Sequence, residues 1–454
     1  MLIFIANTPK AYAWGSRDAL PELLGTAPNG EPQAELWLGA HPEAPASVAK
    51  ASTVERTLID LIESDPERYG VDGGALPFLL KVLGIGAPLS LQVHPNLEQA
   101  IAGFAAEEAA GVPLDAPHRN YGDPNHKPEL LVALGEVTAL SGFRPIDQVR
   151  EDLRALATAA ASVSARQALE RTLELAAGEP EEARGKLLRW ALAGGSEVLS
   201  TLSGIAEAVD RLEAAAAVAA TAVNSVDPTL DDAETHDADY TTDAPMPALR
   251  RAALRSLLQA YPTDPGVVVS LLLHLVRLQA GEAIYLGAQQ LHAYLSGIGV
   301  EVMAASDNVL RAGLTPKHVD VAEVHRVVDL GELDTPRIAA TRLERGLVSW
   351  DPAIRDFRLL RARLCTPGDD EFADEQRLGA REDTAELLRI AAPYPLVLIV
   401  TEGRIRVERH DDLGEVVSVS RGQSLYVSAG GVIELSGAGE VFLATVGSDW
   451  AGVS

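Results

Sequence analysis

The distribution of apolar residues changes along the chain and predicts a β domain interrupted by helices. In residues 1–146 and again in 265–330, short apolar segments lie between Gly and Pro residues, which is typical of strands and turns. From 147 to 264, Ala- and Leu-rich stretches carry apolar residues at the spacing of packed helices. Residues 331–454 hold short apolar runs separated by Gly turns, a pattern typical of a small barrel or jelly roll. The sequence therefore predicts a mainly β fold with an α-helical insertion between two halves of one β domain.

The stretch Leu89–Pro95 combines a strand pattern with residue types that bind metals. Polar and apolar residues alternate from Ser90 to His94, so Gln92 and His94 point to the same face of the predicted strand. An imidazole and an amide oxygen that converge on one point can bind a divalent metal. The alternative is an edge strand with a solvated polar face, and this stretch alone does not decide between them.

Two later residues extend this candidate metal site. Glu129 precedes a predicted strand, and His292 follows a Gly-containing turn. Together with Gln92 and His94 they provide two imidazoles, one carboxylate and one amide oxygen, which match a Zn²⁺ shell with room for water or substrate. A single carboxylate leaves such a site net positive, which favours an anionic or enediolate intermediate. A lone His is more often structural than a ligand, so each His keeps a structural interpretation.

Charge excludes some classes of partner and points to others. The formal net charge of −27 argues against nucleic acid or an anionic membrane as the main partner. A phosphorylated substrate would need its own cluster of Lys and Arg side chains. Lys81 lies within the apolar segment Phe78–Leu83, where an unpaired ammonium would be costly, so we expect it to have a partner or a function.

Features of the whole chain limit the ligands and the location of the protein. Cys365 is the only cysteine, so there is no intramolecular disulfide or Cys-based zinc site. Residues 226–247 contain seven acidic residues and no Lys or Arg, which predicts an exposed, mobile loop. No segment matches a signal peptide or a membrane span, and the predicted location is the cytoplasm.

Several long motifs follow one another through the predicted β domain. They are Leu89–Pro95, Tyr121–Glu129, His292–Gly297 and Glu301–Lys317. Shorter segments fit the same pattern: Tyr12–Ser16, Glu35–Pro42 and Pro77–Leu83. In this order they resemble the type I mannose-6-phosphate isomerases, or phosphomannose isomerases, of the cupin superfamily.

The resemblance implies a fold and a reaction. The fold would consist of a catalytic cupin barrel (1–146 and 265–330), a helical domain (147–264) and a second, metal-free cupin-like barrel (331–454). The activity would be the reversible isomerisation of D-mannose 6-phosphate and D-fructose 6-phosphate through a cis-enediol, in mannose metabolism and GDP-mannose supply. The expected partner is a small sugar phosphate, and a monomer is favoured.

The resemblance also assigns roles to individual residues. It implies one zinc ion per chain, held by Gln92, His94, Glu129 and His292. Arg311, a permanently charged planar fork, would stabilise the enediolate or bind phosphate. Asp307, four residues earlier, would orient Arg311. Acid–base catalysis is expected from Glu301 and Lys127, with the metal favouring the neutral amine of the lysine. Substrate contacts are expected from Ser90, Lys81, Lys317 and Trp14.

Two other functions stay open on the sequence alone. Two His and a carboxylate also suit Fe(II) in a metal-dependent cupin oxygenase. A sugar-binding regulator could keep the fold without turnover. The Gln92 ligand and the Arg311 and Lys317 cations argue against the oxygenase, and the presence of Lys127, Glu129 and Arg311 argues against the regulator. Ala87 stands where many members of the family carry Lys, which removes one expected phosphate contact.

Overall fold

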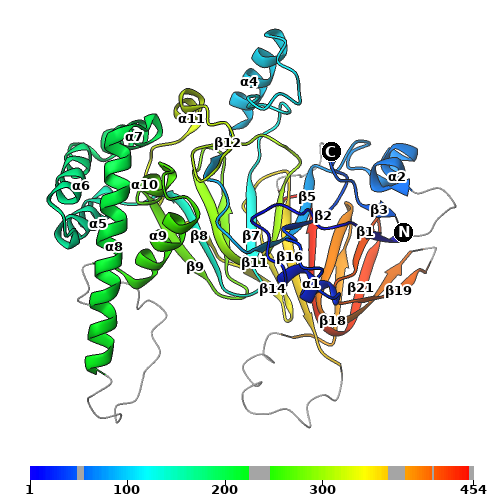
Figure 1. Ribbon diagram of the computed structural model, residues 1–454. Coiled ribbons are helices and arrows are strands. Elements are labelled where there is room, and N and C mark those ends of the chain that lie inside the picture. The colour runs from blue at the N-terminus through cyan, green and yellow to red at the C-terminus, as the bar shows by residue number, and fades with distance from the viewer. Residues whose placement is uncertain (49–55, 224–245, 367–383, 412–413, 449–454) are drawn as a thin grey trace.

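Two antiparallel β-sheets and one group of helices make up the protein. The computed structural model describes residues 1–48, 56–223, 246–366, 384–411 and 414–448. Within these residues the helical group lies at one end, a ten-stranded sheet lies in the middle and an eleven-stranded sheet lies at the other end (Figure 1). Of the acidic segment 226–247, all but the last two residues lie outside the described residues. None of the described helices is long and apolar enough to cross a membrane.

The ten-stranded sheet is organised around its longest strand. Its strands are β2 (Glu35–Leu38), β5 (Phe78–Ile85), β6 (Gln92–Val93), β7 (Glu129–Ala133), β8 (Val137–Phe143), β9 (Leu273–Leu278), β10 (Ala283–Leu286), β11 (His292–Ala304), β12 (Leu310–Arg311) and β13 (Arg337–Ile338). The first part of β11 pairs with β6 and β8, and its second part pairs with β5 and β7. The register shifts between Tyr294 and Ser296, so β11 bends and the sheet curves around an interior.

The eleven-stranded sheet combines the C-terminal part of the chain with its first residues. Its strands are β1 (Leu2–Ala6), β3 (Ser47–Val48), β4 (Arg56–Thr57), β14 (Thr341–Glu344), β15 (Leu347–Trp350), β16 (Arg358–Leu364), β17 (Leu387–Ala391), β18 (Leu396–His410), β19 (Val416–Ser420), β20 (Ser424–Val427) and β21 (Val432–Thr445). Strand β1 pairs with β20, so the N-terminal segment belongs to this sheet by its hydrogen bonds. Hydrophobicity alone could not show this pairing, because an apolar strand fits either sheet.

Gly403 lies inside a paired strand, two residues after a bulge, and is not one of the Gly turns that the sequence pattern predicts. The segments on either side of it form one strand, β18, of 15 residues. Gly403 has a φ of +70°, and the register of β18 against β21 shifts between Val400 and Glu402. A Cβ atom at Gly403 would lie 2.0 Å from the carbonyl oxygen of Ala438. Glycine is therefore required by a close approach inside a paired strand.

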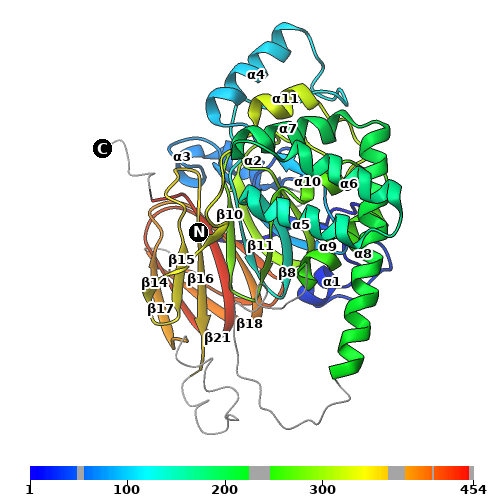
Figure 2. The ribbon, with the colours of Figure 1, turned by 90° about the vertical axis from the view of Figure 1, so that its left-hand side faces the viewer.

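The helical insertion covers the outside of the ten-stranded sheet. Its helices are α5 (Ile146–Ala159), α6 (Val163–Leu175), α7 (Pro180–Ala193), α8 (Ser196–Val223) and α9 (Ala248–Ala260). Among the described residues, further helices lie outside the insertion: α1 (Ala19–Leu24), α2 (Leu58–Ser64), α3 (Pro66–Tyr69), α4 (Leu97–Ala109), α10 (Gly266–Ser270) and α11 (Val321–Val327). Buried residues of the insertion, such as Leu169 and Ile205, share one core with Leu140 of β8 and Leu273 of β9. The helices of the insertion lie over β8 (Figure 2).

The two sheets pack against each other through a second apolar core. Leu80 and Val82 of β5 and Leu130 of β7 contribute from the ten-stranded sheet, and Trp350 and Phe442 contribute from the eleven-stranded sheet. The opposite face of the ten-stranded sheet looks into its own curved interior. The prediction of a mainly β fold with a helical insertion is confirmed. The two curved sheets stand where two barrels were expected, although neither strand order closes on itself within the described residues.

A buried cluster of charges joins the helical insertion to the ten-stranded sheet. Asp152 of α5 forms an ion pair with Arg144, and Nε of Arg250 lies 3.7 Å from the same carboxylate oxygen. The two arginines also donate to the chain entering β9, from Arg144 Nε to the Leu271 carbonyl at 2.9 Å and from Arg250 Nη2 to the Leu273 carbonyl at 3.0 Å. Asp152 is only 5% exposed, so its carboxylate neutralises the two guanidinium groups at a place that water does not reach.

We expect Asp152→Ala to lower the free energy of unfolding by about 3–5 kcal/mol, because it leaves two buried guanidinium groups without their carboxylate. Urea unfolding followed by circular dichroism measures this change. Asp147→Ala on the same helix is the control. Its side chain is 81% exposed, and we expect a change within about 0.5 kcal/mol. Equal effects of the two substitutions would contradict the proposed importance of the cluster.

Candidate active site

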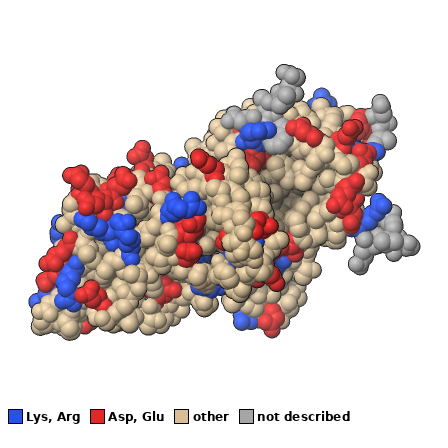
Figure 3. All heavy atoms as spheres, turned by 90° about the horizontal axis from the view of Figure 1, so that it is seen from above, with Lys and Arg blue, Asp and Glu red and all other residues tan. Residues whose placement is uncertain are grey.

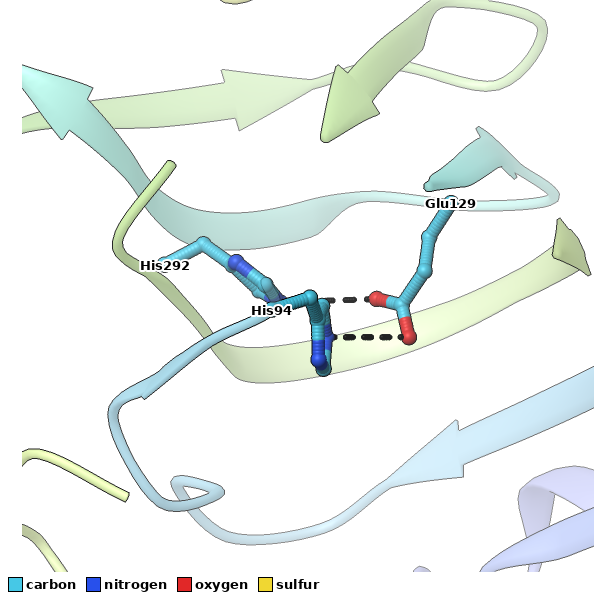
Figure 4. Close-up of side chains that lie close together, drawn as sticks. All are labelled: His94, Glu129 and His292. Atoms are coloured by element: carbon cyan, nitrogen blue, oxygen red, sulfur yellow. Dashed lines mark ion pairs between the residues drawn. The ribbon is translucent and has the colours of Figure 1, made fainter. Parts of the chain in front are cut away.

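Three side chains from distant parts of the chain meet inside the ten-stranded sheet. His94 follows β6, Glu129 begins β7 and His292 begins β11. One possible ligand atom from each lies within 4.8 Å of the others, and all three residues are buried. Both imidazole rings point toward the Glu129 carboxylate (Figure 4). Within the described residues this is the one such group of His, Cys, Asp or Glu that could hold a metal ion.

Backbone carbonyls orient both imidazoles toward the carboxylate. His94 Nδ1 lies 2.6 Å from the Asn308 carbonyl oxygen, and His292 Nδ1 lies 2.9 Å from that of Gln290. A carbonyl can only accept, so each Nδ1 carries the proton and each Nε2 presents a lone pair. The Nε2 atoms of His94 and His292 lie 3.3 and 3.4 Å from the two oxygens of Glu129.

The ligand atoms have no hydrogen-bond partner of their own. His94 Nε2, His292 Nε2 and Glu129 Oε2 are buried and unsatisfied. Buried polar atoms are seldom left in this state, and three of them converging on one point fit a metal ion. The residues present therefore suit a divalent cation such as zinc, whose ordinary ligands include imidazole nitrogen and carboxylate oxygen.

The local electrostatics keep these groups in the protonation states that metals need. Burial, together with the positive charge of Lys127, lowers the pKa of His94 to about 4, which favours the neutral ring. Burial would raise the pKa of Glu129, but the positive charge of Lys127 beside it outweighs the effect of burial. The pKa of Glu129 is held well below its usual value. A neutral imidazole and an ionised carboxylate are the forms that coordinate.

Gln92 lies next to this group through strand pairing. It is directly opposite His292 of β11 on one side and opposite Arg311 of β12 on the other. Residues directly opposite each other in antiparallel strands have their side chains on the same face. Gln92, His292 and Arg311 therefore share one face, which is consistent with the predicted fourth ligand and with a cation beside the metal group.

A buried network of charges lies deeper on the same face of the sheet. Lys81 Nζ lies 3.5 Å from Glu35 Oε2 and 3.7 Å from Glu301 Oε2, and it stands 4.6 Å from the centre of the Trp37 ring. The Tyr294 hydroxyl donates to Glu301 at 2.9 Å. Lys81 was expected to have a partner, and it has two carboxylates. Strand alternation alone could have placed Glu35 and Trp37 on one face, but it could not show that they face Lys81.

The pKa values in this network shift because of burial and neighbouring charges. Burial would lower the pKa of Lys81, but Glu35 and Glu301 outweigh it and raise the pKa, so the ammonium stays charged. Burial has the largest effect on Glu301 and raises its pKa, and repulsion from Glu129 raises the pKa further. A carboxyl group with a raised pKa can both accept and donate a proton near neutral pH.

The structure places the other expected catalytic residues around the metal group, with one correction. Lys127 Nζ lies 3.0 Å from Glu129 Oε1. Asp307 was expected to orient Arg311, but its carboxylate lies 3.2 Å from His41 Nε2 instead. The segment from Asp307 to Arg311 is not helical, and four residues of extended chain span roughly 13 Å, so the two side chains do not meet.

Arg311 and Lys317 form a cationic region. In the part of the chain that the structure describes, the half-buried Arg311 guanidinium has neither an ion pair nor a hydrogen bond. Partial burial has the largest effect on the exposed Lys317 and lowers its pKa, and repulsion from Arg311 lowers the pKa further. Two cations that repel each other in a chain of net charge −27 suit an anionic ligand. On the face seen from above, acidic and basic side chains are mixed (Figure 3).

The remaining expected substrate residues lie on connecting segments. Ser90 is half-buried just before β6. The carbonyl of Trp14 accepts hydrogen bonds from the backbone of Gly86 and Ala87, at 2.9 and 3.0 Å, and its half-buried ring packs on the core inside the sheet. These contacts tie Trp14 to the segment that leads to Ser90 and Gln92.

Asn308 is a supporting residue that sequence reasoning missed. It is fully buried, and its side-chain nitrogen donates to the carbonyls of Asp123 and Asn125 at 2.8 and 2.7 Å. Its side-chain oxygen accepts from Gly122 at 2.8 Å, while its own carbonyl faces His94. Asn308 therefore ties the loop before Glu129 to the ligand His94. It lies within the motif Glu301–Lys317, but its residue type gives no sign of a contact with His94.

Comparison with known proteins agrees with this geometry. A model of the phosphomannose isomerase type I catalytic domain matches residues 2–146. The mannose-6-phosphate isomerase of Escherichia coli (strain K12) is 38% identical over 328 residues, which cover 70% of this chain and 73% of that protein. The Homo sapiens mannose-6-phosphate isomerase is 28% identical over 426 residues, which cover 88% of this chain and 89% of that protein.

Solved structures show the same similarity over nearly the whole chain. A crystal structure of mannose 6-phosphate isomerase in a zinc-bound holo form superposes with a TM-score of 0.75 at 30% identity, covering 98% of this chain and 99% of that one. A mutant of phosphomannose isomerase from Salmonella typhimurium gives a TM-score of 0.75 at 29% identity, with the same coverage. The chain therefore belongs to the family of type I phosphomannose isomerases.

Proposed function

We propose that this protein is a zinc-dependent isomerase that interconverts D-mannose 6-phosphate and D-fructose 6-phosphate through a cis-enediol. The observation that carries the proposal is the buried group of His94, Glu129 and His292, whose unsatisfied ligand atoms face one another. Strand pairing places Arg311 on the same face as His292. Family membership and the zinc-bound form of a similar structure support it.

The proposed metal site takes one zinc ion per chain. His94, Glu129 and His292 would hold it, with Gln92 as the fourth ligand. A bound zinc ion acts as a Lewis acid toward substrate oxygens. The protein itself contributes the orientation of both imidazoles, through the carbonyls of Asn308 and Gln290, and a buried site from which water is largely excluded.

Proton transfer between C2 and C1 of the sugar is assigned to two residues of this face. Glu301 has a raised pKa and is hydrogen-bonded by Tyr294, so it can take and return a proton. Lys127, beside Glu129, is the second candidate. Arg311 presents a fixed positive charge for the enediolate or the phosphate.

Binding of the substrate is assigned to the cationic region and its surroundings. We propose phosphate contacts from Lys317, Ser90 and Lys81, and a pocket wall from Trp14. Lys81 is 6% exposed and paired with Glu35 and Glu301, so in its phosphate contact it would also keep its pairing with these carboxylates. Asp307 contacts His41 and is left out of the proposed catalytic set.

Other parts of the proposal concern the whole chain. We propose the division into a catalytic domain (1–146 and 265–330), a helical domain (147–264) and a C-terminal domain (331–454). Strand pairing departs from these bounds, because β1, β3 and β4 join the C-terminal sheet and β13 joins the catalytic sheet. A monomeric state and a cytoplasmic location stay predictions.

We expect His94→Ala and His292→Ala each to remove most of the bound zinc and most of the activity, because each leaves the ion without one of its buried ligands. Mass spectrometry of metals in the purified protein measures zinc per chain. His410→Ala is the control, since His410 is exposed on the eleven-stranded sheet and contacts Glu434. Full zinc occupancy in either site variant would show that the ligand assignment is wrong.

We expect Arg311→Ala to keep the zinc content and the fold but to lower kcat by about a hundredfold or more, because it removes a fixed positive charge from the transition state. Arg311→Lys should restore little of the activity, since an ammonium cannot make a bidentate contact. Steady-state kinetics measure the change, with the exposed Arg337→Ala as control. Near-normal kcat in Arg311→Ala would contradict this role of Arg311, and Lys127 would then be the next candidate for stabilising the enediolate.

We expect isomerisation of D-mannose 6-phosphate in D₂O to place deuterium at C1 of the product in less than full amount. A base in a buried site exchanges part of the abstracted proton with solvent before it returns it. Nuclear magnetic resonance of the product measures the label. Conversion without any deuterium would contradict an exchanging base, and oxygen uptake without isomerisation would indicate an oxygenase.

A further inference from the structure

A loop of the eleven-stranded sheet reaches the segment that carries the candidate active-site residues. The loop, residues 351–357, connects β15 to β16. Asp356 Oδ2 lies 2.9 Å from Nε2 of His126, and His126 directly precedes Lys127. The two side chains are 14% and 24% exposed, so the contact is mostly shielded from water.

His126 and Lys127 lie on opposite sides of the same extended segment. Lys127 and Glu129 point into the site, where their charged atoms are 3.0 Å apart. Side chains alternate along an extended chain, so His126, Pro128 and Leu130 lie on one side and Lys127 and Glu129 lie on the other. Leu130 belongs to the core between the two sheets, which is the side from which Asp356 approaches.

The loop that carries Asp356 is held firmly against its own sheet. Phe357 is fully buried in the core between the sheets. The backbone of Gly447 donates to the Arg355 carbonyl at 3.0 Å, and a Cβ atom at Gly447 would lie 1.7 Å from the carbonyl oxygen of Ile354. The loop therefore lies directly on the backbone of Gly447, and Asp356 extends from a fixed base.

The segment before β7 is attached to its surroundings on either side of His126. On one side, the Asn125 carbonyl accepts from the Asn308 side chain at 2.7 Å and from the Ser306 hydroxyl at 3.2 Å. The Asn125 side chain accepts from the backbone of His126 at 3.0 Å, and the Pro128 carbonyl accepts from Ala304 at 3.1 Å. Between these two points, the His126 side chain contacts Asp356 and the Lys127 side chain contacts Glu129. A carboxylate–imidazole contact of 2.9 Å has the length of a charge-assisted hydrogen bond and also restricts the backbone that carries it.

We propose that Asp356 is a positioning residue for the isomerase reaction: acting through His126, it holds the backbone on which Lys127 is directed at the Glu129 carboxylate. The inference rests on the proposed function, because its effect is on turnover. It gives the eleven-stranded sheet, which lacks a metal group in its described part, a direct role in the catalytic geometry.

The test compares Asp356→Ala with Asp356→Asn in the full-length zinc-loaded enzyme. We expect the alanine variant to lose about tenfold or more in kcat with KM and zinc content nearly unchanged, because small displacements of a catalytic group lower turnover while the phosphate contacts stay in place. Asparagine keeps an oxygen that can accept from His126, so we expect it to restore most of kcat. If Asp356→Ala does not fold, Asp356→Ser, which is too short to reach the ring, takes its place with the same expected loss.

Two controls separate positioning from general loss of structure. Asp351→Ala loosens the same loop, since Asp351 accepts from the backbone of Ala353 at 3.0 Å, but it does not contact His126, and we expect kcat within twofold of the parent. In a double-mutant cycle, Asp356→Ala combined with His126→Ala should be no slower than the slower single variant.

Each result has a defined meaning. A parent enzyme that does not isomerise the sugar phosphate would overturn the proposed function and this inference with it. An active parent with an unchanged Asp356→Ala variant would overturn the inference alone. Additive losses in the cycle, an equal loss in Asp351→Ala, or a loss of zinc in Asp356→Ala would also overturn it, because the effect would then not run through His126 to Lys127.

Discussion

The buried negative charge of Glu129 is the constraint on which the candidate site depends. A carboxylate inside a protein is costly unless positive groups or hydrogen bonds surround it. Lys127 lies 3.0 Å away, and the imidazoles of His94 and His292 face the two carboxylate oxygens. Three ligand atoms of this group still lack hydrogen-bond partners, and a divalent cation would satisfy them together. The geometry of the site therefore follows from the need to stabilise the buried carboxylate of Glu129.

The ten-stranded sheet separates stability from chemistry by using its two faces differently. One face, with residues such as Leu80 and Leu130, packs against the other sheet and supplies an apolar core. The opposite face carries Lys81 and Glu301 in its interior, where charges pair with one another. Strand β11 runs through both parts of the site, since it begins at His292 and reaches Glu301 nine residues later. One bent strand thus sets the distance between the metal group and the proposed acid–base residue.

The eleven-stranded sheet takes part in this arrangement in two ways. It covers the apolar face of the catalytic sheet, and it recruits the first strand of the chain, Leu2–Ala6, by hydrogen bonding to β20. Its loop before β16 also reaches the backbone next to Lys127 through Asp356. A sheet without a metal group in its described part can therefore act on the geometry of the site through packing and one polar contact.

Local chemistry and periodicity determined the β, α, β order, the helices of the insertion and the residue types of the metal group. Gln92 and His94 follow from strand alternation, and Lys81 was expected to need a partner because it lies in an apolar strand. Pairing between distant segments was decided by the tertiary structure: Glu35 beside Lys81, His41 in place of Arg311 beside Asp307, and Asn308 behind His94. The physical reason is that a side chain's type and face depend on its neighbours in sequence. Its partner across space depends on strand register and loop path, which are set by the packing of the whole chain.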